Sequence, residues 1–144
     1  MMRKAILFLL FSIVSFAQVP QGMSHRGTAY SSTGVILQDA NISIRVRILD
    51  GSSTGALVYE ETYNKTTNSA GQYNINIGQG TVQGSNNFDS IEWSTGQKWL
   101  EIGIAPSSNP TNFVIGSSQL MSVPYALYSE KSNNATTKIN NIAD

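Results

Sequence analysis

A chain of 144 residues with nine basic and nine acidic side chains is long enough for one domain, and its charge balance argues against a nucleic-acid-binding surface or a basic membrane-binding patch. Charged residues make up only 12% of the chain, against roughly a quarter in an average protein. There is no cysteine, which excludes disulfides, thiol nucleophiles and a lipid-anchoring cysteine after a signal peptide.

The N-terminus predicts export. A basic start that contains Arg3 and Lys4 precedes an apolar run, and small residues, Ser15 and Ala17, follow it. This order is typical of a secretory signal peptide, and the run is shorter than the about 20 residues of a membrane span. We expect a signal peptide at 1–17, cleavage between Ala17 and Gln18, and a secreted or cell-surface product; a buried N-terminal strand or helix is the alternative.

The first half of the remaining chain has the pattern of strands. Residues 24–30 predict a peripheral strand, in which Gly27 marks a bulge or a close approach. Residues 41–51 predict the central strand, because β-branched residues alternate there with polar ones. The apolar set should be buried and the other set, with both arginines, should form a cationic, solvated face. The apolar set is Ile42, Ile44, Val46 and Ile48, and the other set is Ser43, Arg45, Arg47 and Leu49.

In two further segments, side chains of different kinds alternate along the chain, and a turn joins the two segments. Residues 56–64 have mixed faces, which favours an edge or near-edge strand. Residues 72–77 should point Tyr73, Ile75 and Ile77 inward. This hairpin is similar to one in prealbumin-like β-sandwiches.

The second half predicts fewer regular elements. After a polar loop at 78–87, Asn87 or Asp89 should cap one helical turn that places Phe88 and Ile91 on the same side. Residues 98–105 predict a strand, and one or two last strands follow at 113–115 and 119–123. Pro124 should sit at a strand end or edge, and residues 125–131 fit either a strand or a helical turn.

This spacing of about seven or eight strands indicates an all-β fold, an antiparallel Greek-key β-sandwich of the prealbumin-like or Ig-like kind. The domain should span 18–128, and the polar residues 129–144 should form a linker or a disordered tail.

No pattern in the chain predicts catalysis, a cofactor or a metal site. His25 is the only histidine, and we expect it to be an ordinary surface residue. Glu60 and Glu61 are adjacent on a predicted strand, so they should point to opposite faces. Asp89 and Glu92 are better explained by capping and solvation than by acid–base chemistry. We therefore expect that the protein is not an enzyme; a hydrolase is the least favoured alternative.

The tryptophans are candidates for sugar stacking. Trp93 and Trp99 flank one turn, and Tyr59 and Tyr63 lie on another predicted strand. Exposed, coplanar rings of this kind stack on sugars in many β-sandwich lectin modules. Core and edge packing is the interpretation that we favour.

Four stretches carry a family resemblance. The most specific is residues 118–128, Ser-Gln-Leu-Met-Ser-Val-Pro-Tyr-Ala-Leu-Tyr; the others are residues 19–24, 48–52 and 88–93. Across about 19–128 the chain resembles an uncharacterised N-terminal domain of secreted Bacteroidota proteins. It departs from them at residues 31–34, where such relatives tend to carry an acidic turn.

The resemblance implies a module that is followed by fibre-like, collagen-like or adhesin-head-like repeats. We expect a secreted, non-catalytic structural or interaction module of a cell-surface or fibre-forming protein, with a protein or a cell-surface glycan as its partner. A small carbohydrate-binding module is the alternative. Whether the chain is a truncated form of a longer protein, and its oligomeric state, are left open.

Overall fold

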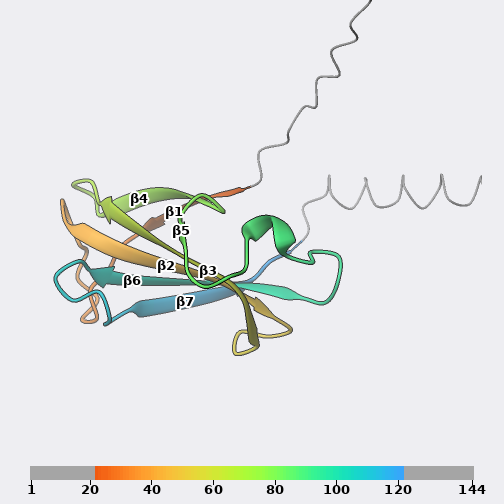
Figure 1. Cartoon of the computed structure of the whole chain (residues 1–144). Helices are drawn as coiled ribbons and strands as arrows, with labels where there is room; N and C mark the ends of the chain where they lie inside the picture. The colour runs from red at the N-terminus through yellow and green to blue at the C-terminus, as the bar shows by residue number, and fades with distance from the viewer. Residues whose placement is uncertain (1–21, 122–144) are drawn as a thin grey trace, which may run out of the picture.

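The computed structural model describes residues 22–121 (Figure 1) and has two antiparallel sheets that stack as a β-sandwich. The larger sheet has five strands in the order β5-β3-β2-β6-β7, and the smaller one pairs β1 with β4. This confirms the predicted all-β class. The elements are β1 (Met23–Thr28), β2 (Asn41–Asp50), β3 (Ala56–Thr66), β4 (Gln72–Ile77), β5 (Thr81–Val82), the 3-10 helix η1 (Phe88–Ser90), β6 (Lys98–Pro106) and β7 (Val114–Gln119).

The prediction of a central strand at 41–51 is confirmed by β2. It pairs along its length with β3 on one side and β6 on the other, and its four β-branched residues have no exposed surface. Leu49 is also buried, although alternation places it on the other face. The pairing with β3 shifts between Ile48 and Leu49, as in a β-bulge, and this interrupts the alternation.

The small sheet covers part of the large one. From β4, the side chains Tyr73, Ile75 and Ile77 enter the core as predicted. Phe88 and Ile91 close one end of it from the predicted helical turn. The side chain of Asn87 makes no capping hydrogen bond there, so the expected cap at this residue is absent.

Other boundaries differ from the predictions in small ways. The two segments expected at 113–115 and 119–123 are represented by one strand, β7, and the two-residue β5 lies within a segment that was expected to be loop. Within residues 22–121, no helix is long and apolar enough to cross a membrane. Several predictions fall outside the described residues: the signal peptide 1–17 with its Ala17–Gln18 cleavage site, Pro124, residues 125–131 and the tail 129–144.

Candidate functional site

The most buried carboxylate of the described chain is Glu61 on β3, which has no exposed surface. Alternation places it between Tyr59 and Tyr63 on the core side, and both hydroxyl oxygens lie 2.9 Å from its carboxylate. The backbone N–H groups of Gly78 and Gly80 donate to it at 2.9 and 2.7 Å. These four donors compensate for the loss of water around this group, although the Tyr63 hydroxyl shares its one proton with the Asn76 carbonyl oxygen, which lies 2.5 Å away.

The contacts of Glu61 therefore join two segments of the chain. Glu61 ties β3 to the Gly78–Gly80 loop between β4 and β5, and a Cβ atom on Gly80 would stand 2.8 Å from its Oε2. Burial, and then the hydrogen bond to Glu61, raises the pKa of both Tyr59 and Tyr63. We call this set, Tyr59, Glu61, Tyr63, Gly78 and Gly80, the carboxylate clamp. Sequence analysis missed the clamp, although a glutamate between two tyrosines at period two was its signal.

The outer face of the large sheet carries an ion-pair network. Arg47 Nε lies 2.5 Å from Glu60, and both arginines lie 3.6 Å from Glu101. The guanidinium of Arg45 stands 4.4 Å from the Phe113 ring centroid, and the Arg45 side chain is only 19% exposed. The expected cationic, solvated face is thus wrong: two carboxylates neutralise it and an aromatic ring partly covers it. As predicted, Glu60 and Glu61 point to opposite faces.

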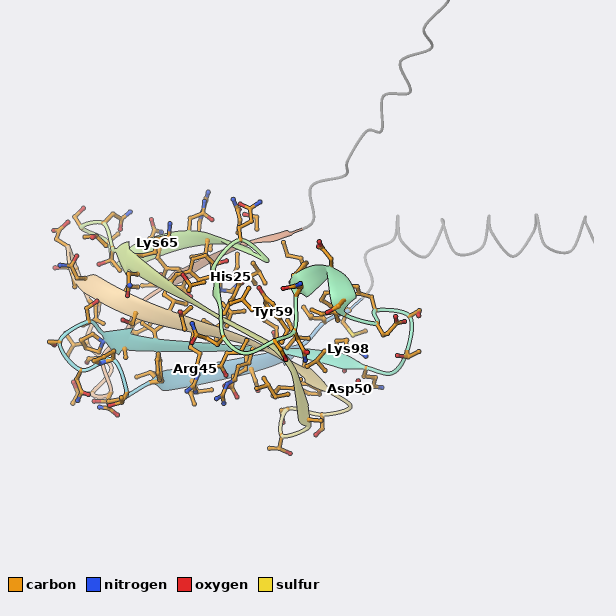
Figure 2. All side chains as sticks on the ribbon, viewed as in Figure 1. His25, Arg45, Asp50, Tyr59, Lys65 and Lys98 are labelled. Carbon is orange, nitrogen blue, oxygen red and sulfur yellow. The ribbon has the colours of Figure 1, made fainter. Side chains whose placement is uncertain are left out.

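A further ion pair closes the end of β2. Lys98 on β6 is buried and donates to Asp50 at 2.9 Å and to the Thr95 carbonyl oxygen. Figure 2 shows Asp50 and Lys98 side by side there. Across residues 22–121, no three His, Asp or Glu side chains gather in a way that could hold a metal ion.

The two tryptophans have different surroundings. Trp93 is 42% exposed and its ring centroid lies 5.4 Å from that of Phe88, which is itself 5.4 Å from Tyr59. Trp99 is half-buried on β6, opposite Leu49 and Gln119, with an indole N–H that has no acceptor among the described residues. No ring pair in this part of the chain joins the two tryptophans. The predicted stacking candidates are therefore not brought together, and Tyr59 and Tyr63 belong to the clamp.

An apolar groove of about 400 Å³ lies between β1 and the β6–β7 pair. In the described residues β1 pairs only with β4 and β7 only with β6, so each has a free edge. Five of the six β7 residues are exposed, and Ile115 is 54% exposed. The groove is lined mainly by His25, Tyr73, Leu100, Ile102, Ile104 and Val114.

His25 is the titratable side chain of this groove besides the tyrosines. It is half-buried, and its Nε2 lies 3.3 Å from the Tyr73 hydroxyl oxygen. Burial lowers the pKa of His25. The expectation of an ordinary surface histidine is wrong. On β1, Met23, His25 and Gly27 lie on the inward side of the strand, so the His25 ring faces Tyr73.

The comparisons with known proteins give a family but no activity. No curated protein matches the chain, and neither does any solved structure. One family model matches residues 24–120, which is more than half of the chain and spans β2 to β7 in full. The chain therefore belongs to the family described as a domain of unknown function, DUF8740.

Proposed function

We propose that the protein is a secreted, non-catalytic structural module, the N-terminal domain of a cell-surface or fibre-forming, adhesin-like protein. In this role its groove holds an extended polypeptide segment. The observation that carries the proposal is the groove between β1 and β7, because it combines an apolar lining with two free strand edges.

A polypeptide suits this groove better than a small substrate does. An extended segment gains backbone hydrogen bonds from a strand edge and places alternate side chains into apolar pockets. Catalysis would need an acid–base pair or an activated nucleophile beside the bound molecule. His25 is the one imidazole here, and its nearest polar partner is a tyrosine hydroxyl.

The ionisable groups elsewhere in the fold also support a structural role. Glu61 is enclosed by its four donors, and the Lys98 amine is held by Asp50 and Thr95. Arg45 and Arg47 pair with glutamates of neighbouring strands. These contacts connect strands and loops of the fold to one another.

The second candidate function is carbohydrate binding. It is favoured by the exposed ring of Trp93 and by the indole N–H of Trp99, which lacks an acceptor within residues 22–121. A broad glycan array on the mature protein separates the two functions. We expect no binding; a hit that disappears in Trp93→Ala or Trp99→Ala, with the fold intact by circular dichroism, would establish the lectin function instead.

Export and assembly test the structural role directly. We expect the extracellular protein to begin at Gln18 and Ile115→Lys to reduce its recovery in the cell-surface or sedimentable fraction. Leu57→Lys is the matched control, because Leu57 is 52% exposed on β3, away from the groove. Retention of the protein inside the cell, or equal recovery of both variants and the unmodified chain, would contradict the proposal.

A further inference from the structure

Two cations of the described chain have no carboxylate beside them. Residues 22–121 contain five arginine and lysine side chains, and three of these, Arg45, Arg47 and Lys98, form ion pairs. Arg26 and Lys65 are the other two, and neither forms an ion pair with a carboxylate of this part of the chain. Both are exposed, and both line the same hollow. The fold neutralises three of its cations and places the remaining two at one site.

Three strands bring the side chains of this hollow together. Arg26 on β1 stands opposite Asn74 on β4, and Gln72 lies two residues from Asn74 on the same side of β4. All three therefore face outward from the small sheet. Lys65 comes from the last part of β3, just before the turn that leads into β4, and Figure 2 shows Lys65 at the end of the sandwich where this turn lies. We call the hollow that these four residues line, with a volume of about 310 Å³, the cationic hollow.

The polar atoms that remain available in the cationic hollow are mostly N–H donors. The neighbouring Asn68 carboxamide is already used, because its Oδ1 accepts from the N–H groups of Ala70 and Gln72 and its Nδ2 donates to Gln72 Oε1. The Gln72 side-chain N–H groups and the Asn74 carboxamide have no hydrogen-bond partner among the described residues. A guanidinium and an ammonium only donate, and no described residue of the lining is acidic. Such a set of groups favours an oxyanion as the ligand.

The size and exposure of the cationic hollow indicate the kind of ligand. Its volume of about 310 Å³ lies at the lower end of the range of small-molecule sites, about 300–1,000 Å³. An acidic residue of the adjoining loop, Asp39, donates its backbone N–H to the Asn68 carbonyl oxygen, but Asp39 is not part of the lining. Because Arg26 and Lys65 are exposed, salt screens their charge. A small ligand of modest affinity fits these properties.

We propose that the cationic hollow binds a small molecule through an oxyanionic group of the carboxylate, sulfate or phosphate class. Arg26 and Lys65 neutralise the charge of this group, and the side-chain amides of Gln72 and Asn74 donate further hydrogen bonds to the ligand. The site shares only Tyr73 with the groove between β1 and β7. It therefore does not depend on the function that we propose for the groove.

Titration of the full mature chain, labelled with ¹⁵N and observed by NMR, tests the site. The probes are sodium phosphate, sodium sulfate and sodium acetate, each added in exchange for sodium chloride at constant ionic strength and neutral pH. We expect at least one probe to shift the backbone amide signals of Arg26, Gln72 and Asn74 in a saturable way. A stronger response to acetate would assign the site to carboxylates, and a stronger response to phosphate or sulfate would assign it to tetrahedral anions.

Two variants and a matched control connect this binding to the cationic hollow. Arg26→Gln and Lys65→Gln should each weaken binding by about tenfold or more, because each removes a charge-assisted hydrogen bond. Arg47→Gln removes the same charge on the outer face of the large sheet, outside the hollow. Because salt screens distant charges, the control should keep the affinity within about twofold. The NMR spectrum of each variant also reports whether its fold is intact.

Three outcomes would overturn the inference. The first is the absence of amide shifts with all three probes. The second is a set of shifts that grow without saturation over the whole surface, which would show non-specific attraction only. The third is an equal loss of affinity in Arg26→Gln and Arg47→Gln, which would mean that net charge decides and the hollow does not. None of them changes the test of the groove, which uses export and the surface assembly of Ile115→Lys.

Discussion

The two edges of the five-stranded sheet are finished in opposite ways. Beyond β3 lies the short β5, and the loop that leads to it is held by the carboxylate clamp around Glu61. At the other side, β7 ends the sheet with exposed apolar residues and a groove. The difference teaches that this fold closes one edge with buried polar contacts and leaves the other edge open among the described residues.

The carboxylate clamp should give the largest effect on stability. Glu61→Ala removes the acceptor of two tyrosine hydroxyls and two backbone N–H groups, all in a buried place. We expect a loss of about 3–5 kcal/mol in the free energy of unfolding, measured by urea denaturation.

The matched control is Glu60→Ala, the next residue on the outer face. It removes a partly exposed ion pair with Arg47, for which about 1 kcal/mol or less is expected. Equal losses at the two positions would mean that the clamp does not hold the β5 edge.

Apolar residues test the difference between the centre and the edge of the sheet. Ile44→Ala on β2 leaves a cavity under a fully buried side chain and should cost about 2–5 kcal/mol. Ile115→Ala on β7 loses contacts that are half exposed, so we expect about 1 kcal/mol or less. Thermal and urea denaturation of the pair measure this contrast, and a larger loss at Ile115 would show that the edge is buried more deeply than the described strands indicate.

A smaller effect is expected on the outer face. Arg45→Ala removes contacts with Glu101 and the Phe113 ring, and we expect a loss of about 1 kcal/mol in urea denaturation. Phe113→Leu in the Arg45→Ala background should then add less than it does alone, because the two residues share one contact. Strict additivity would show that the stacking does not stabilise the fold.

The smallest effect concerns pH at the groove. Burial lowers the pKa of His25 in the folded state, so the unfolded chain binds a proton more readily. The stability that the neutral form contributes is present above the unfolded pKa of about 6.5 and falls as pH drops below it. The urea midpoint of the unmodified chain should therefore decline more between pH 7 and 5 than that of His25→Gln. Parallel declines would show that His25 titrates as if it were exposed.

Much of the fold could be predicted from local pattern. Alternation of β-branched residues at 42–48 locates the buried side of the central strand because the period of side chains in a strand is two. The same rule fails at Leu49, where a bulge shifts the register, and bulges depend on pairing with another strand. The 3-10 turn at Phe88 was also predictable. A helical turn places two large apolar residues that are three positions apart, Phe88 and Ile91, on the same side of the chain.

The site was less predictable, because it is made by residues that lie far apart in the sequence. Glu61 meets Gly78 and Gly80 only after β3 and the loop that follows β4 have come together, and His25 meets Tyr73 only after β1 has paired with β4. The neutralised outer face depends on register as well: Arg47 stands between Glu60 and Glu101 only once β2 has joined both neighbours. The alternation of apolar and polar residues within one strand does not show which residues of other strands it will contact.

The position of β2 also determines the order in which the molecule can fold. Its pairing with β3 closes a short hairpin, whereas its pairing with β6 joins residues such as Asp50 and Lys98 that are 48 positions apart. Contacts of such sequence separation carry a larger loop-closure cost and slow the folding of β-proteins. During synthesis or transport the hairpin is available early, but the core remains open until the whole segment to Pro106 has emerged. The domain is therefore completed by one of its last strands, so a chain interrupted before β6 would leave one side of the central strand β2 unpaired.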